Sequence, residues 1–228
     1  MRADSLEAIH REVIACRRCR RLREYCKMVA DEKRRQFRDQ EYWGRPVPGF
    51  GDPGARLLVV GLAPAAHGAN RTGRMFTGDN SGLWLYRALF RAGFSSQEKS
   101  EKREDGLSLR DAYITAIVRC APPANKPLPE EWKACSRFLV QELESLKKIR
   151  VFLALGQIAL KGLWQVLPAE LKVSRAVPKF AHGLRVPLRD GRLLLCSYHP
   201  SQQNTFTKKL SEPMFDRVFA EVNDFLKH

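Results

Sequence analysis

Short apolar runs and longer helical stripes alternate along the chain. Continuous apolar runs at residues 56–61, 113–118 and 151–155 are typical of strands that are buried on both faces. Stripes with helical spacing occupy about 81–92 and 130–149, which lie between those runs. Strands that alternate with helices in this way predict a mainly parallel sheet with helices on both sides.

Further elements are predicted toward the two ends of the chain. Residues 4–15 carry one apolar stripe with Asp4 as a candidate helix cap, and a last apolar stripe predicts a C-terminal helix. The runs 184–188 and 192–196 flank a hairpin-turn signal. Pro187 favours an edge position for the first of these strands, because proline has no N–H to donate to a neighbour.

The composition is that of a folded chain with one large core. Of its 228 residues, 44% are hydrophobic and 29% are charged, so we expect a single domain over residues 1–228. No apolar run is long enough to span a membrane as a helix, and the first residues lack the apolar segment of a secretory signal. The sequence therefore predicts a cytoplasmic protein without a membrane partner.

The charge balance is strongly basic. Forty Lys and Arg residues against 25 Asp and Glu give a formal net charge of +15. A surface of this kind favours a polyanionic partner, of which nucleic acid is the commonest, with a merely basic enzyme as the alternative. One charged insert, residues 95–110, is expected to be exposed.

The six cysteines favour metal binding over disulfides, because thiols stay reduced in the cytoplasm. Cys16 and Cys19 form a C-x2-C pair, and Cys120 with Cys135 forms a second pair that could complete a four-sulfur site. The spacing does not choose between zinc and an iron–sulfur cluster, and Cys135 also suits the core side of a helix. Cys26 stays without a role.

A glycine-rich loop, GLAPAAHGANRTGRMFTGD, follows the first strand at residues 61–79. It contains neither the G-K-S/T of a P-loop nor a dinucleotide-binding fingerprint. Its Asp79 is the only acidic residue between Asp52 and Glu98, and a helix cap is its alternative role. Ligands of parallel α/β sheets bind beyond the carboxyl ends of the strands, so this loop is a candidate site.

Three segments resemble the family 5 (UDGb-type) uracil-DNA glycosylases: the loop at 61–79, VRCAPPANKP at 118–127 and SYHPSQQNTFT at 197–207. They follow the family's order, and the resemblance covers nearly the whole chain. It implies a three-layer α/β/α fold with a central, mainly parallel four-stranded sheet. It also implies hydrolytic removal of damaged bases from DNA and a [4Fe-4S] cluster. The ligands that it implies are Cys16, Cys19, Cys120 and Cys135.

The sequence departs from the sister family 4 at two positions. Leu62 stands where that family has an acidic residue, and Ala116 stands where it has the asparagine that reads uracil. A site that does not hydrogen-bond the edge of the base discriminates weakly. We therefore expect uracil and other deaminated bases, such as hypoxanthine and xanthine, to be substrates. The alternatives are a uracil-specific, family 4-like enzyme and a non-catalytic iron–sulfur protein that binds nucleic acid.

Breaking an N-glycosidic bond leaves positive charge on the deoxyribose and negative charge on the departing base. His199 is the expected donor to the base, and Asp79 is expected to orient the water or stabilise the sugar cation. Asn125 is an alternative holder of that water. Phe76 is expected to stack on the flipped base, with a core aromatic as its alternative role.

Other motif residues are candidate contacts to the substrate, which is expected to be DNA with uracil or other deaminated bases. Backbone N–H groups near Gly61, Ala63 and Ala65 are suited to polarising the base. The loop at 201–205 lacks a large apolar wedge, and the resemblance implies a monomer. The candidate DNA contacts are Arg71, Arg74, Lys126, Ser201, Gln202, Gln203, Asn204, Lys208 and Lys209.

Overall fold

Four parallel strands form the middle of the sheet in the computed structural model, which describes residues 5–228. They are β3 (Ala112–Ala116), β2 (Leu57–Gly61), β4 (Val151–Leu155) and β6 (Leu193–Ser197), in this spatial order. All of their residues are buried, as the continuous apolar runs predicted for β2, β3 and β4.

The expected number of four strands is wrong, because the sheet has six. Short β1 (Phe50–Gly51) pairs antiparallel with β3, and β5 (Arg185–Pro187) pairs antiparallel with β6. The sheet is therefore mixed and mainly parallel. Both additions cover an edge that would otherwise expose unpaired backbone groups. The predicted hairpin is confirmed, and Pro187 lies on the edge strand.

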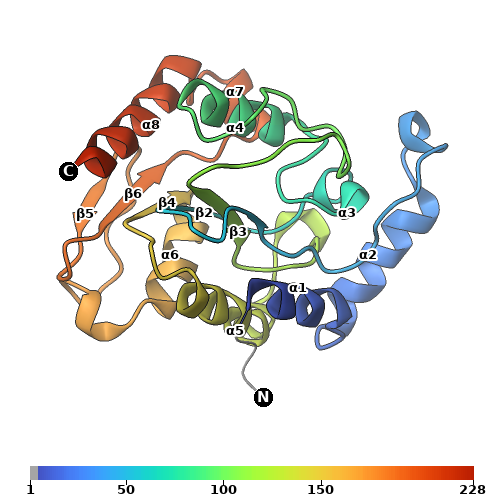
Figure 1. Ribbon diagram of the computed structural model, residues 1–228. Coiled ribbons are helices and arrows are strands. Elements are labelled where there is room, and N and C mark those ends of the chain that lie inside the picture. The colour runs from blue at the N-terminus through green and yellow to red at the C-terminus, as the bar shows by residue number, and fades with distance from the viewer. Residues whose placement is uncertain (1–4) are drawn as a thin grey trace.

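Two layers of helices cover the sheet (Figure 1). One face packs against α1 (Leu6–Ala15), α5 (Pro129–Ser145) and α6 (Gln157–Val166), and the other packs against α4 (Asn80–Arg91) and α8 (Glu212–Lys227). The apolar side chains of each strand alternate between these two cores, which gives the expected three-layer arrangement. The remaining elements are the helix α2 (Arg20–Glu32) and the short α3 (Ala69–Thr72), α7 (Gln202–Phe206), η1 (Arg35–Phe37), η2 (Pro123–Asn125) and η3 (Ala169–Leu171).

The structure refines two expectations about local elements. Asp4 lies outside the described residues, and Ser5 caps α1 by accepting the N–H of Ala8 at 3.3 Å. The charged insert at 95–110 is not uniformly exposed, because Leu107 and Leu109 are buried in the core. None of the helices within residues 5–228 has the length and apolar character needed to cross a membrane.

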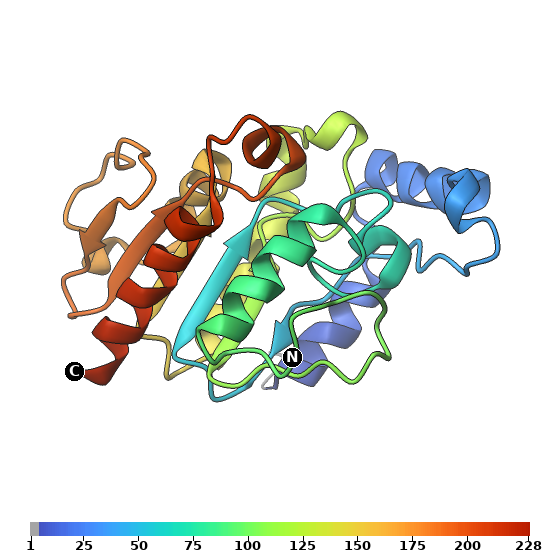
Figure 2. The ribbon, with the colours of Figure 1, turned by 90° about the horizontal axis from the view of Figure 1, so that it is seen from above.

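The strand register brings the motif loops to one edge of the sheet. Gly61 at the end of β2 pairs with Ala116 at the end of β3, and Leu155 at the end of β4 pairs with Ser197 at the end of β6. Figure 2 shows α7, which follows β6, at the same end of the sheet as the loop that follows β3. This edge is where ligands of parallel sheets bind.

Candidate active site

Gly61, Phe76 and His199 meet at this edge. A Cβ built on Gly61 would lie 2.8 Å from the ring of Phe76, so only glycine leaves room for that ring. Phe76 itself has a φ of +53°, an uncommon backbone conformation for a residue with a side chain. Its ring centroid lies 5.8 Å from that of His199. Three predicted site residues from two distant segments therefore face one another.

The loop after β6 holds His199 by internal hydrogen bonds. The Asn204 side-chain amide donates to the carbonyl oxygen of His199 at 2.9 Å, and Ser201 accepts the backbone N–H of Asn204 at 3.3 Å as the cap of α7. Gly156, at the end of β4, lies against the same histidine. Asn204 and Ser201 thus position the loop, a role that sequence reasoning did not assign to them.

Burial lowers the pKa of His199 to about 4, so the imidazole is neutral at neutral pH. A neutral imidazole carries one N–H donor and one acceptor nitrogen. It is therefore able to donate a hydrogen bond without adding a positive charge to the site.

Asp79 caps α4 and also belongs to the site loop. Its Oδ1 accepts the N–H of Gly82 at 2.8 Å. Burial raises its pKa, and hydrogen bonds from the backbone of Gly82 and Ser81 and the charge of Arg71 act against that rise. A Cβ on Gly68 would lie 2.1 Å from Oδ2, so that glycine makes room for the carboxylate.

One hydrogen bond joins the Asp79 segment to the His199 segment. The side-chain amide of Asn80 donates to the hydroxyl of Thr205 in α7 at 3.4 Å. Asn125, in contrast, is exposed, and among the described residues no side-chain hydrogen bond ties it to either segment. Hydrogen bonds from Gly68 and Asn70 to the carbonyl of Ala65 fold the glycine-rich loop back on itself. We refer to Gly61, Phe76, Asp79 and His199 as the base site.

Arg71 and Arg74 are buried and fully engaged inside the protein, with 7% and 3% of their surface exposed. Arg74 forms an ion pair with Asp105 at 2.6 Å and donates to Ser100 at 2.8 Å. The Arg71 guanidinium donates to backbone carbonyls of its own loop and to Gln40. The expectation that these two arginines contact phosphate is corrected, because the guanidinium nitrogens of both already donate to partners within the protein.

The remaining candidate DNA contacts lie at the surface. Lys126, Gln202, Gln203, Lys208 and Lys209 are exposed, and the Lys209 ammonium lies 4.9 Å from the centre of the Tyr198 ring. Ala63 is half-buried and packs against the core beneath the loop.

Sequence reasoning missed Phe206, the last residue of α7. Its surface is 74% exposed, the largest value among the large hydrophobic residues described as exposed. Residues 201–205 themselves contain no large apolar side chain, but the next residue supplies one. The signal was present in the sequence, where one aromatic residue stands within the polar run from Ser201 to Lys209.

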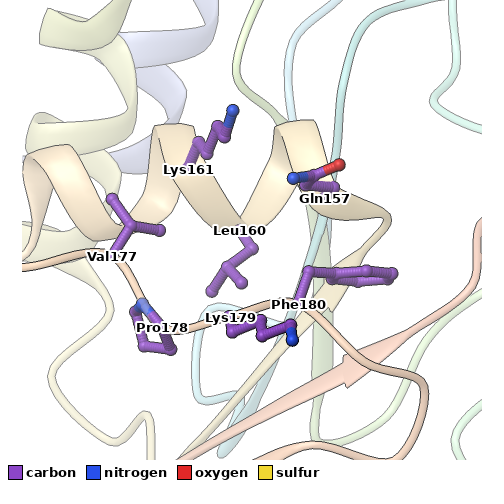
Figure 3. Close-up of a pocket in the computed structure, with 7 residues that line it drawn as sticks. All are labelled: Gln157, Leu160, Lys161, Val177, Pro178, Lys179 and Phe180. Carbon is purple, nitrogen blue, oxygen red and sulfur yellow. The ribbon is translucent and has the colours of Figure 1, made fainter.

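A recess of about 330 Å³ opens beside the His199 loop. Figure 3 shows Gln157, Leu160 and Lys161 on α6 and the other lining residues on the facing segment. One of these, Phe180, has its ring centroid 6.0 Å from that of Tyr198, the neighbour of His199. We call this cavity the lysine recess, lined by Gln157, Leu160, Lys161, Val177, Pro178, Lys179 and Phe180.

The four predicted metal ligands line a second, smaller recess. Cys16 and Cys19 lie between α1 and α2, Cys120 follows β3, and Cys135 lies on α5. We call this the thiol recess. As the side chains lie, no three His, Cys, Asp or Glu residues between 5 and 228 are arranged to hold a metal ion. Burial raises the pKa of Cys135 to about 11, so holding its thiolate requires a cation.

Comparison with known proteins places the chain among DNA repair enzymes. A profile described as "Uracil DNA glycosylase superfamily" matches residues 48–225. The chain is 51% identical to the type-5 uracil-DNA glycosylase of Thermus thermophilus over 95% of this chain and 96% of that protein. It is 48% identical to the type-5 enzyme of Mycobacterium leprae, over 96% and 95% of the two chains. A type-4 uracil-DNA glycosylase of Thermotoga maritima is 30% identical over 68% and 69%.

Proposed function

The chain belongs to the type-5 enzymes of the uracil-DNA glycosylase superfamily, and from this premise we propose how its residues divide the reaction. The enzyme hydrolyses the N-glycosyl bond that joins uracil to deoxyribose in DNA. Such an enzyme must take the base out of the duplex stack and stabilise opposite charges on the base and the sugar. The base site contains an aromatic ring and an imidazole that suit the base, and a carboxylate that suits the sugar.

Phe76 and His199 act on the base. Phe76 stacks on the flipped base, and the neutral imidazole of His199 donates to the carbonyl oxygen where negative charge collects. The observation that carries this proposal is the contact of Gly61, the Phe76 ring and the His199 ring at one strand end. A neutral donor avoids placing a fixed cation beside the cationic sugar.

Asp79 acts on the sugar side, where it orients the water and offsets the positive charge. We favour Asp79 over Asn125 because the Asn80–Thr205 hydrogen bond ties the Asp79 segment to the His199 loop. The raised pKa of Asp79 reflects burial, and an ion in such a low-dielectric environment interacts strongly with a developing charge.

The range of bases extends beyond uracil to hypoxanthine and xanthine. Ala116 ends β3 directly beside Gly61 and offers only a methyl group, so no side-chain amide at that position selects the edge of uracil. A site of this kind discriminates by shape and stacking rather than by hydrogen bonds.

Phe206 and the surface lysines contact the DNA. An exposed aromatic ring beside the site is suited to the gap that the flipped base leaves in the stack. The net charge of +15 provides the general attraction to phosphate. The exposed contacts that we propose are Lys126, Gln202, Gln203, Lys208 and Lys209.

The thiol recess holds a [4Fe-4S] cluster through Cys16, Cys19, Cys120 and Cys135. Support comes from the donor set, because four thiols from three distant segments line one recess and four thiolates are what such a cluster takes. Bound there, the cluster would join the N-terminal helices to the loop after β3. Zinc is the second candidate, because the same donor set suits it.

Base excision followed by alkali tests the function. Duplexes with one uracil, hypoxanthine or xanthine are incubated with the protein, and alkali then cleaves any abasic site. We expect strand cleavage with all three and none with an undamaged duplex. Cleavage of the uracil duplex alone would contradict the broad range, and a lack of cleavage would contradict the assigned reaction. Iron and sulfide analysis of the purified protein separates the cluster from zinc.

A further inference from the structure

A buried ion pair borders the thiol recess. Arg119 and Glu142 have 1% and 0% of their side chains exposed, and the guanidinium Nη2 donates to Glu142 Oε2 at 2.5 Å. The hydroxyl of Thr115 donates to the same oxygen at 2.6 Å, and that of Tyr113 donates to Oε1 at 3.4 Å. The carboxylate therefore has hydrogen-bond partners on both oxygens.

The guanidinium, by contrast, is only partly satisfied. Nε and Nη1 of Arg119 are buried and have no hydrogen-bond partner among the described residues. Leaving buried donors of a charged group unpaired is costly, so native proteins rarely do so without a ligand. Arg119 lines the thiol recess together with all four candidate ligands, and its backbone N–H donates to Cys135 Sγ at 3.3 Å.

We propose that Arg119 is a positioning residue for the cofactor, with its unpaired N–H groups donating to the sulfur atoms of the cluster site and Glu142 holding the guanidinium in place. This inference rests on the proposed [4Fe-4S] cluster. N–H donors and a nearby positive charge stabilise an anionic cluster and set its reduction potential. Glu142 fixes the direction of the donors because its own oxygens are held by Thr115 and Tyr113.

The test compares cluster retention and potential in Arg119→Lys, Arg119→Met and Glu142→Gln. We expect Arg119→Met to lose its visible absorption to a chelator about 10- to 100-fold faster than the parent, with a more negative midpoint potential. Arg119→Lys keeps the positive charge but lacks the planar guanidinium and its several N–H donors. Its rate of cluster loss and its midpoint potential should therefore lie between those of the parent and of Arg119→Met. Arg74→Met is the matched control, because it also breaks a buried arginine–carboxylate pair but one that does not line the thiol recess.

The outcomes separate this inference from the proposals on which it rests. One outcome is a parent that contains iron while the Arg119 variants match Arg74→Met both in the rate of cluster loss to a chelator and in midpoint potential. That result would overturn the role of Arg119 alone. A parent without iron would overturn the cofactor and the inference together, and its excision of uracil would still report on the reaction. The double variant Arg119→Met/Glu142→Gln, which removes both charges, provides folded protein if the single variants fail to fold.

The lysine recess carries a second, independent inference. Lys161 and Lys179 line it, and none of its other lining residues is charged. Gln157 begins α6 just past the carboxyl end of β4, and Phe180 precedes β5 at that same edge of the sheet, beside Tyr198. The recess therefore opens at the edge where the base site lies.

We infer that the lysine recess binds the part of the DNA strand that flanks the target nucleotide. The volume of about 330 Å³ is in the range of small-ligand sites, and Pro178 and Phe180 offer apolar surface to sugar or base. Lys161 extends from α6 away from the facing segment that carries Lys179 (Figure 3), so the two ammonium groups suit different phosphates of the strand. The inference rests on the proposed DNA reaction. It adds a contact surface that none of the three sequence motifs contains.

Salt-dependent kinetics of Lys161→Ala/Lys179→Ala test this contact on a uracil duplex. We expect KM to rise with kcat unchanged, and the slope of log affinity against log salt to fall by roughly 0.9 for each lost contact. Lys147→Ala/Lys148→Ala is the matched control, because these exposed lysines precede β4 at the opposite edge. Equal effects of the two double variants would overturn the inference, whereas an inactive parent would instead contradict the reaction itself.

Discussion

The base site owes its shape to residues without side chains, whereas the thiol recess owes its shape to side chains that carry charge. Gly61 and Gly68 make room for the Phe76 ring and the Asp79 carboxylate. The thiol recess is instead bordered by the buried Arg119–Glu142 pair and by four thiols. One region relies on close backbone approach and the other on charges that need partners.

This difference predicts that the two regions respond separately to substitution. Changes in the base site alter turnover and leave the cofactor and the fold in place. Changes in the thiol recess alter cofactor retention and stability first, because they leave buried charges or thiols without partners.

Asp79→Asn should cause the largest loss of turnover. Asparagine still caps α4, so the melting temperature and the iron content should stay near those of the parent. Loss of the charge should lower kcat by about 10²–10⁴-fold. Single-turnover excision from a uracil duplex measures this, with Asn125→Ala as the control. A greater loss in Asn125→Ala than in Asp79→Asn would reverse our assignment of the water.

His199→Ala should lower kcat by about 10²–10³-fold, the usual effect of removing one donor to a developing negative charge. Affinity for the uracil duplex should change little, because the loop is held through the backbone carbonyl of His199. Excision rates and DNA binding, measured side by side, check this expectation. Parental turnover in His199→Ala would remove the imidazole from the mechanism.

Cys135→Ser should affect the thiol recess rather than the base site. Loss of one of four sulfur ligands should lower cofactor affinity by at least about tenfold, and the thermal stability should fall with the iron content. Iron analysis and melting curves measure both. A variant with full iron content would show that Cys135 is a core residue rather than a ligand, which was its alternative reading.

Phe206→Ala should reduce kcat/KM on duplex DNA by about 10- to 100-fold, because base stacking on an aromatic ring contributes about 1–3 kcal/mol. The loss should be smaller on single-stranded uracil DNA, where no gap in a stacked duplex needs filling. Phe206→Trp should keep most of the activity. Equal losses on both substrates would argue against a role in opening the duplex.

A further prediction concerns the pH dependence of stability. The folded pKa of His199, about 4, lies below its unfolded value near 6.5, so the unfolded chain binds a proton first as pH falls. The parent should therefore lose stability between about pH 6.5 and 4, and His199→Gln should lose less over that window. Melting temperatures across this range measure the difference, and parallel curves would contradict the burial of a neutral imidazole.

The central fold was predictable because buried parallel strands have a local signature. The apolar runs at 56–61 and 151–155 each became a fully buried strand within a residue or so of the expected bounds. The two-residue strand β1 carries no such signature, because its place comes from pairing with β3 across about 60 residues of chain. Edge pairing of this kind depends on tertiary structure.

The site residues were likewise predictable where local sequence determines them and not where tertiary contacts do. His199 and Phe76 were predictable from their motifs, and the structure brings their rings together. The burial of Arg74 was not, because it depends on Asp105, which lies 31 residues away in an insert that looked like solvated charge. Charge at a motif position therefore does not distinguish a phosphate contact from an internal ion pair.

A crystal structure of His199→Ala bound to a uracil-containing duplex would show which residues hold the flipped base. We predict a flipped uracil stacked on Phe76 beside Gly61, with the deoxyribose next to the Asp79 carboxylate. A uracil held near Asn125, away from Phe76 and Asp79, would contradict the assignment of the base site.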